Sequence, residues 1–157
     1  MEPKSPRESE VTLAQMMLPI DANTRGNIHG GTIMKLADSA GGAAAMRHAR
    51  QRVVTVAVES MTFLHPVHVG DLVSVRARII WTGRTSLEAE IRVDAERPET
   101  GTMRHISTGY LSFVAVDAEG KPTAVPPLAL ETEEDRQRWD AAAARRTRHR
   151  TAQARTS

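Results

Sequence analysis

The chain has 157 residues, a length that suits one compact domain with a sizeable core and is short for two. It holds no cysteine, which excludes disulfides and thiolate metal ligands, and only 3% of its residues are aromatic, which argues against base-stacking nucleic-acid sites. The net charge of +2 arises in residues 131–157, where seven arginines stand against five acidic residues. The rest of the chain is electrically balanced, so its charge points to no partner.

The chain starts with a charged, proline-bearing segment, MEPKSPRESE, that no apolar signal-peptide core follows. We expect residues 1–10 to be a flexible lead-in and the protein to be soluble and cytoplasmic, since no later run is as long as a membrane span. The apolar residues 11–18 predict a first strand that ends at Pro19. Turn-forming residues follow this strand, namely Asp21, Asn23, Gly26 and Asn27.

A helix is predicted over residues 31–50. Apolar side chains recur there at helical spacing, and Arg47, His48 and Arg50 stand near the C-terminal end, where the helix dipole favours positive charge. Much of this segment is glycine and alanine. Such a thin helix can lie close against a sheet.

Four segments with period-two alternation follow the helix, over residues 53–64, 72–81, 86–96 and 105–117. Each is typical of a strand with one solvent-exposed face. One strand, one helix and then four strands in a meander predict an α+β domain over residues 11–130, in which an antiparallel sheet of about five strands wraps around one long central helix. The free edges of that sheet favour pairing with a second copy, so we expect at least a dimer.

The last segment, residues 131–157, is rich in helix formers, with acidic residues early and arginines late. It has almost no large apolar residue after Trp139, so we expect a short helix that passes into a disordered basic tail. Binding of this tail to nucleic acid or to a membrane surface is disfavoured, because no aromatic residues interleave with its arginines.

Asp38 raises the question of function, because it places a carboxylate in a helix of small residues. If the small-residue side of the helix lies on the sheet, this carboxylate is at least partly desolvated and suited to act as a general base near neutral pH. The alternative is an exposed aspartate paired with Lys35, a surface contact of little energetic value. The position in the helix leaves both interpretations open.

The segment NIHGG stands at the start of the same helix. Asn27 is either a turn residue or a side-chain amide that orients water or substrate. Gly30 and Gly31 either permit a tight turn or let a substrate oxygen approach the free backbone amides of the helix N-terminus, as an oxyanion site requires. His29 is interpreted as a positioning or packing residue of this site.

A second group of polar residues, Arg84, Thr85 and Ser86, lies in the segment GRTS. An arginine fork beside two hydroxyls can bind phosphate, although a plain hairpin with a solvated arginine also explains the pattern. Thr55 and Lys121 are weaker candidates for substrate contact. No metal site is expected, because His65 and His68 have no third ligand at motif spacing, and no serine-hydrolase or nucleotide-binding fingerprint is present.

Four separate segments resemble, in order and spacing, those of the hotdog-fold acyl-CoA thioesterases of the cytosolic acyl-CoA hydrolase type. The segments are MLPIDANTRGNIHGGTIMKLAD, RVVTVAVESMTFLHPVHVGDLV, WTGRTSLEAEIRV and FVAVDAEGKPTAVPPL. The resemblance spans roughly residues 11–130. It implies that Asp38 is the catalytic carboxylate, that Asn27 is the catalytic asparagine and that the GRTS loop lies by the nucleotide of coenzyme A.

The resemblance further implies a homodimer with each site at the subunit interface, so that Asp38 and Asn27 of one site come from different chains. A hexamer built as a trimer of dimers is frequent in such proteins. The expected reaction is hydrolysis of acyl-CoA to free CoA and a carboxylic acid, without a cofactor. Asp38 would act as a general base or as a nucleophile that forms a mixed anhydride, and the sequence does not separate the two.

Two other functions fit the same fold. An acyl-CoA-sensing or carrier-binding module would use the pocket without turnover, but such a binder has no use for a buried carboxylate. A hydratase or dehydratase would place a histidine in a proline-bearing active-site loop. The segment HPVHVGD has that composition, but it lies at a strand turn after the helix. We therefore expect a thioesterase of undetermined acyl-chain preference.

Overall fold

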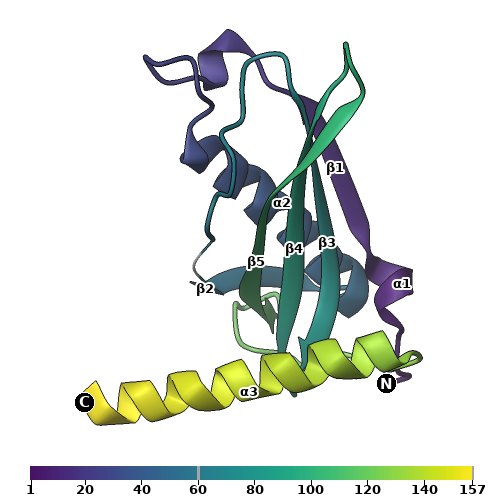
Figure 1. Ribbon diagram of the computed structural model, residues 1–157. Helices are drawn as coiled ribbons and strands as arrows, with labels where there is room; N and C mark the ends of the chain where they lie inside the picture. The colour runs from purple at the N-terminus through teal and green to yellow at the C-terminus, as the bar shows by residue number, and fades with distance from the viewer. Residues whose placement is uncertain (60, 157) are drawn as a thin grey trace.

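The computed structural model describes residues 1–59 and 61–156 (Figure 1). Its elements in chain order are α1 (Pro6–Ser9), β1 (Val11–Met16), the 3-10 helix η1 (Pro19–Asp21), α2 (Gly30–Ala49), β2 (Arg52–Val58), β3 (Leu72–Thr82), β4 (Ser86–Arg97), β5 (Thr102–Val116) and α3 (Glu133–Thr156). The predicted α+β fold with one central helix and a five-stranded antiparallel sheet is confirmed.

The strand order in the sheet is β1-β3-β4-β5-β2. The predicted meander of four strands is therefore wrong for β2, which pairs with β5 and not with its successor β3. The predicted strand over residues 53–64 is also too long, since β2 ends at Val58, and residue 60 lies outside the described residues. The segment after β2 therefore runs from the β2 edge of the sheet, past β5 and β4, to β3. Strand β2 is left as a free edge.

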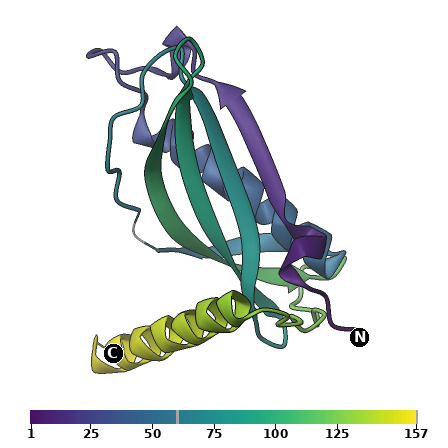
Figure 2. The ribbon, with the colours of Figure 1, turned by 45° about the vertical axis from the view of Figure 1, so that its right-hand side comes forward.

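Helix α2 lies against one face of the curved sheet, as both ribbon views show (Figures 1 and 2). Its buried side is made of small residues, including Ala37, Ala40, Gly41 and Ala44. A Cβ atom added at Gly41 would lie only 3.0 Å from Cζ of Phe113 on β5. The prediction that small residues bring this helix close to the sheet is thus confirmed, and it fixes which side of α2 remains free.

Helix α3 lies across the other face of the sheet, near the end of the strands, and its C-terminal end projects past the sheet edge (Figure 1). It is continuous from Glu133 to Thr156, so the prediction of a short helix that passes into a disordered tail is wrong over the described residues. Ala142 is fully buried in this contact. Among the described residues, no helix combines the length and the apolar character that crossing a bilayer requires.

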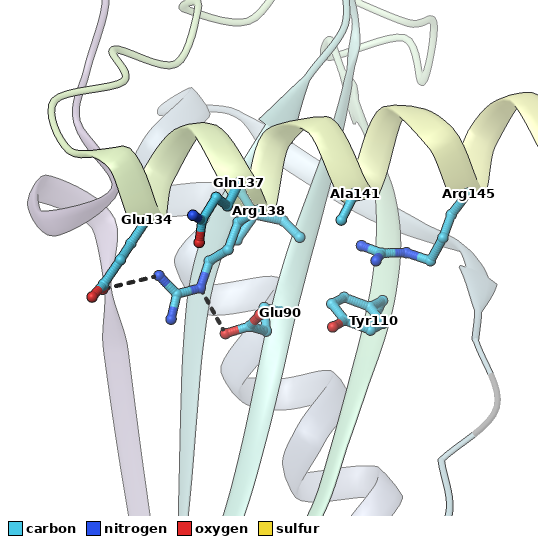
Figure 3. A pocket seen from close by; sticks show the side chains of 8 residues that line it. Glu90, Tyr110, Glu134, Gln137, Arg138, Ala141 and Arg145 are labelled. Carbon is cyan, nitrogen blue, oxygen red and sulfur yellow. Dashed lines mark hydrogen bonds and ion pairs between the residues drawn. The ribbon is translucent and has the colours of Figure 1, made fainter.

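Arginine stems and ring faces replace aliphatic side chains in the contact between α3 and the sheet. The Arg145 guanidinium lies 3.6 Å from the ring centre of Tyr110, and the Trp81 and Trp139 rings are 5.8 Å apart. Arg138 and Arg145 reach from α3 toward Glu90 and Tyr110 on the sheet (Figure 3). Long charged side chains can bury their stems in this way, which explains why the absence of large apolar residues misled the sequence prediction.

The buried histidine of α2, His48, ties the helix to the chain that leads into α3. Its Nε2 donates to the carbonyl oxygen of Pro126 at 2.9 Å, and its side chain is inaccessible to solvent. Burial lowers the pKa of His48 below its ordinary value of 6.5; the Pro126 carbonyl opposes this shift and Lys4 adds to it. The folded protein therefore disfavours the protonated form of His48.

Stability should accordingly fall when the medium becomes acidic. The unfolded chain takes up a proton near pH 6.5 and the folded chain resists it, so the contribution is complete above that pH and is lost as the pH falls below it. We expect Tm to drop more between about pH 7.5 and about pH 5 in the wild type than in His48→Gln, which keeps an N–H donor without the titration. Equal drops, measured by circular dichroism, would contradict this assignment.

Candidate functional site

The loop before α2 is held in shape by its two asparagines. The Asn23 Oδ1 accepts the backbone N–H of Arg25 at 2.9 Å and that of Asn27 at 3.2 Å. Gly26 adopts a positive φ of 84° in this turn, a conformation that glycine tolerates best. The loop thereby fixes the direction from which the chain enters the helix.

Both asparagines line a cavity of about 250 Å³ at the start of α2, together with Gly30 and the aromatic ring of Phe63. The structure therefore brings two asparagine amides, and not Asn27 alone, to the N-terminus of the helix. The sequence pattern predicted Asn23 only as a turn residue. The sequence signal for Asn23 was its position in the segment DAN, directly before the turn that contains Gly26.

The first turn of α2 supplies the candidate oxyanion site. The helix begins at Gly30, with His29 as its N-cap residue, and the first amides of a helix have no preceding turn to bond to. A Cβ atom at Gly30 would lie 3.4 Å from the Phe63 ring, whereas nothing lies within 4 Å of one at Gly31. The His29 side chain is exposed and makes no capping hydrogen bond. The space beside Gly31 is thus open on the side where a side chain would stand.

The Asp38 carboxylate is fixed by the edge strand. Its Oδ1 accepts a hydrogen bond of 2.7 Å from the Thr55 hydroxyl on β2. Thr55 was predicted as a substrate contact, and the structure makes it the partner of Asp38 instead of Lys35. Within the single chain Asp38 is exposed, because it lies beside the buried small-residue side of α2 and not on it. The expected desolvation is therefore not supplied by the chain itself.

Asp38 and the helix N-terminus do not form one site within a single chain. Asp38 stands eight positions after Gly30, which at the rise of an α-helix places them about 12 Å apart along the axis. The strand beside Asp38 is also unusually open for an apolar strand. Val54, Val56 and Val58 of β2 are 46%, 56% and 49% exposed.

The segment GRTS forms the turn between β3 and β4, closed by a hydrogen bond of 2.8 Å from the Gly83 N–H to the Ser86 carbonyl. The Arg84 side chain is exposed, and Lys121 is exposed in a separate turn after β5. Ser86 faces the side of the sheet that α3 covers, where it lines a cavity with residues of that helix. In the described part of the chain, none of Arg84, Thr85, Ser86 and Lys121 forms a hydrogen bond or ion pair with Asp38, whose side-chain partner is Thr55.

The chain matches the thioesterase superfamily over residues 25–102. An uncharacterized acyl-CoA thioester hydrolase of Zymomonas mobilis is 42% identical over 131 residues, which cover 81% of this chain and 85% of that protein. The chain belongs to the thioesterase superfamily. Within it, the similarity is to the acyl-CoA thioester hydrolases, as the four sequence segments indicated.

Two similar solved structures align with nearly the whole length of this chain. The chain is similar to an apo-hexameric acyl-CoA thioesterase, at 32% identity with a TM-score of 0.93 over 98% of this chain and 99% of that chain. It is also similar to the acyl-CoA hydrolase of Staphylococcus aureus, solved as an asparagine-to-alanine variant with coenzyme A, at 29% identity with a TM-score of 0.91 over 99% of this chain and 94% of that chain. The thioesterase described here therefore has the hotdog fold.

Proposed function

We propose that this protein hydrolyses acyl-CoA thioesters to free CoA and a carboxylic acid, at a site shared between two copies of the chain. The observation that carries the proposal is the Asp38 carboxylate, oriented by Thr55 beside an open edge strand and about 12 Å along α2 from the amides of its own helix N-terminus. A second copy that pairs along β2 would supply the missing amides and cover the carboxylate.

The proposed chemistry needs a base, an oxyanion site and an orienting amide. Asp38 takes a proton from water as the water oxygen attacks the thioester carbonyl carbon, and the collapse of the tetrahedral intermediate expels the CoA thiolate. Direct attack by the Asp38 oxygen, with hydrolysis of the resulting anhydride, uses the same groups. The amides at Gly30 and Gly31 of the second copy stabilise the charged oxygen, and His29 positions this turn.

The asparagine that acts with Asp38 is proposed to be Asn23. The Staphylococcus aureus hydrolase has been solved as three separate alanine variants. One replaces an asparagine, another an aspartate fifteen residues later, and the third a threonine seventeen residues after that aspartate. In this chain the same spacings join Asn23, Asp38 and Thr55. Asn27, which the sequence analysis assigned, stands four residues too late for this pattern. Its role stays a prediction, which a comparison of the two variants can test.

The proposed assembly is at least a dimer that pairs through β2. Three valines of β2 are about half exposed, and an exposed apolar edge strand pairs readily with another copy. A hexamer, as in the similar apo-hexameric thioesterase, is the proposed larger assembly. The cytoplasmic location remains a proposal that rests on the resemblance to cytosolic hydrolases.

The GRTS turn, with Arg84, Thr85 and Ser86, is proposed to contact the CoA nucleotide, and Lys121 to support it from the neighbouring turn. No cofactor takes part in the proposed reaction, because water is the only co-reactant that hydrolysis needs.

Release of free thiol from butyryl-CoA tests the proposal. Steady release by the purified protein, with multiple turnovers per site, supports a hydrolase. Binding of butyryl-CoA without turnover would favour a sensing or carrier-binding module instead. Repeating the assay over thioesters of graded chain length would then define the acyl preference.

A further inference from the structure

A second cavity, named here the α3 pocket, lies between the C-terminal part of α3 and the outer face of the sheet. It is not the cavity of Figure 3, which lies nearer the start of α3. The α3 pocket has a volume of about 310 Å³. Its polar lining comes from the sheet side and from the helix, namely Glu59, Ser86, Glu88, Ser112, Arg146, His149, Arg150 and Gln153. Helix α3 lies outside residues 25–102, over which the chain matches the superfamily.

Two arginines and two glutamates line the α3 pocket, and both carboxylates already have partners in the folded chain. The buried Glu88 carboxylate is paired with two arginines, at 2.7 Å to Arg145 and 3.7 Å to Arg146. Glu59 has His149 as its partner at 3.1 Å. Among the described residues, the Arg150 side chain has neither an acidic partner nor a hydrogen-bond acceptor. Its guanidinium therefore remains free to bind a ligand at the pocket wall.

Three guanidinium groups crowd together on this part of α3, and the pKa of Arg146 reflects that crowding. Burial lowers the pKa of Arg146; Glu88 opposes this shift, and Arg150 and Arg145 add to it through repulsion. Crowded guanidinium groups gain most from an anion that can bridge them, because it relieves their mutual repulsion and accepts their hydrogen bonds. Arg146 already donates to the Ser112 hydroxyl at 3.3 Å, so the pocket also presents neutral polar groups.

The position of the pocket links it to the proposed reaction. Val56 of β2 lines it, and the preceding residue, Thr55, holds the Asp38 carboxylate on the other side of the strand. Ser86, the last residue of the GRTS turn, lines it from β4. The pocket and the proposed catalytic carboxylate therefore lie on opposite sides of the same strand, β2.

We propose that the α3 pocket binds the phosphorylated nucleotide end of coenzyme A, with Arg150 and Arg146 as the residues that contact its phosphates. This inference rests on the proposed thioesterase function and adds α3 to the substrate site. Arginine suits the task because its planar fork matches phosphate geometry. The expectation is that α3 sets the affinity for CoA thioesters and does not act on the thioester bond.

The test compares two arginines of the same helix. Arg150→Gln removes a lining guanidinium, and Arg148→Gln removes an exposed one that does not line the pocket. Each variant is assayed with butyryl-CoA and with the butyryl thioester of N-acetylcysteamine, which has the same bond without the nucleotide. We expect Arg150→Gln to raise KM for butyryl-CoA about 10-fold, as the loss of one charge-assisted hydrogen bond predicts, and Arg148→Gln to change it less than about twofold.

The cysteamine thioester distinguishes a wrong proposal for the reaction from a wrong proposal for the nucleotide site. If wild-type protein hydrolyses neither thioester, the proposed function itself is wrong. If both arginine variants act alike on butyryl-CoA, or if Arg150→Gln slows the cysteamine thioester as much as butyryl-CoA, the pocket does not recognise the nucleotide. Titration calorimetry gives an independent result: wild type should bind CoA more tightly than pantetheine, and Arg150→Gln should lose most of that difference.

Discussion

Asp38→Asn should lower kcat for butyryl-CoA about 1,000-fold, within the range that general acid–base catalysis contributes. Asparagine keeps the shape of the side chain and an oxygen that accepts the hydrogen bond of 2.7 Å from Thr55, so the change removes only the charge and the basicity. KM should change little, because the carboxylate acts on the attacking water and not on the CoA moiety.

Asp140→Asn is the matched control for this prediction. Asp140 is an exposed carboxylate on α3 that neither the site nor the α3 pocket uses, and its amide variant should retain activity within about twofold of wild type. Both variants should keep the wild-type Tm within a few degrees. A rate for Asp38→Asn close to that of wild type, with the fold intact, would remove Asp38 from the mechanism.

The second large effect is expected at Asn23. Asn23→Asp keeps an oxygen for the backbone amides of Arg25 and Asn27, so the loop should hold, while the side-chain N–H donor is lost. Loss of one orienting donor in such a site costs about 100-fold or more in kcat. Asn27→Asp adds the same charge to the same cavity, and we expect it to lower kcat less than about threefold.

These two variants decide between the asparagines by steady-state kinetics. A large loss in Asn27→Asp together with near-normal turnover in Asn23→Asp would restore the assignment made from the sequence. Equal losses in both would indicate that charge in the cavity, and not the identity of the donor, controls the rate.

The central part of the fold was predictable because its pattern is local. Alternation predicted the strands, and the spacing of apolar residues predicted α2 to within one residue of Gly30–Ala49. The pairing of β2 with β5 was not predictable, since it depends on how a long connection crosses the sheet. The length of α3 was also missed, because Arg145 and Arg146 pack through cation–π contacts that a count of apolar residues does not detect.

The candidate site was predictable in part for a related reason. Asp38 stands out in the sequence as a carboxylate among small residues, and the same helix carries the glycines of the proposed oxyanion site. Its hydrogen bond to Thr55 joins residues 17 positions apart and needs the fold to become visible. Arg150 gave no signal because its role depends on a cavity between α3 and the sheet.

The most direct test of a site shared between two copies is a mixing experiment with two inactive proteins. Asp38→Asn and Asn23→Asp are unfolded together and refolded as an equal mixture, and hydrolysis of butyryl-CoA is measured. If each site takes its aspartate and its asparagine from different copies, half of the dimers have one intact site, and activity should return to about a quarter of the wild-type value. A mixture that remains as inactive as its two components would show that each chain builds its site alone.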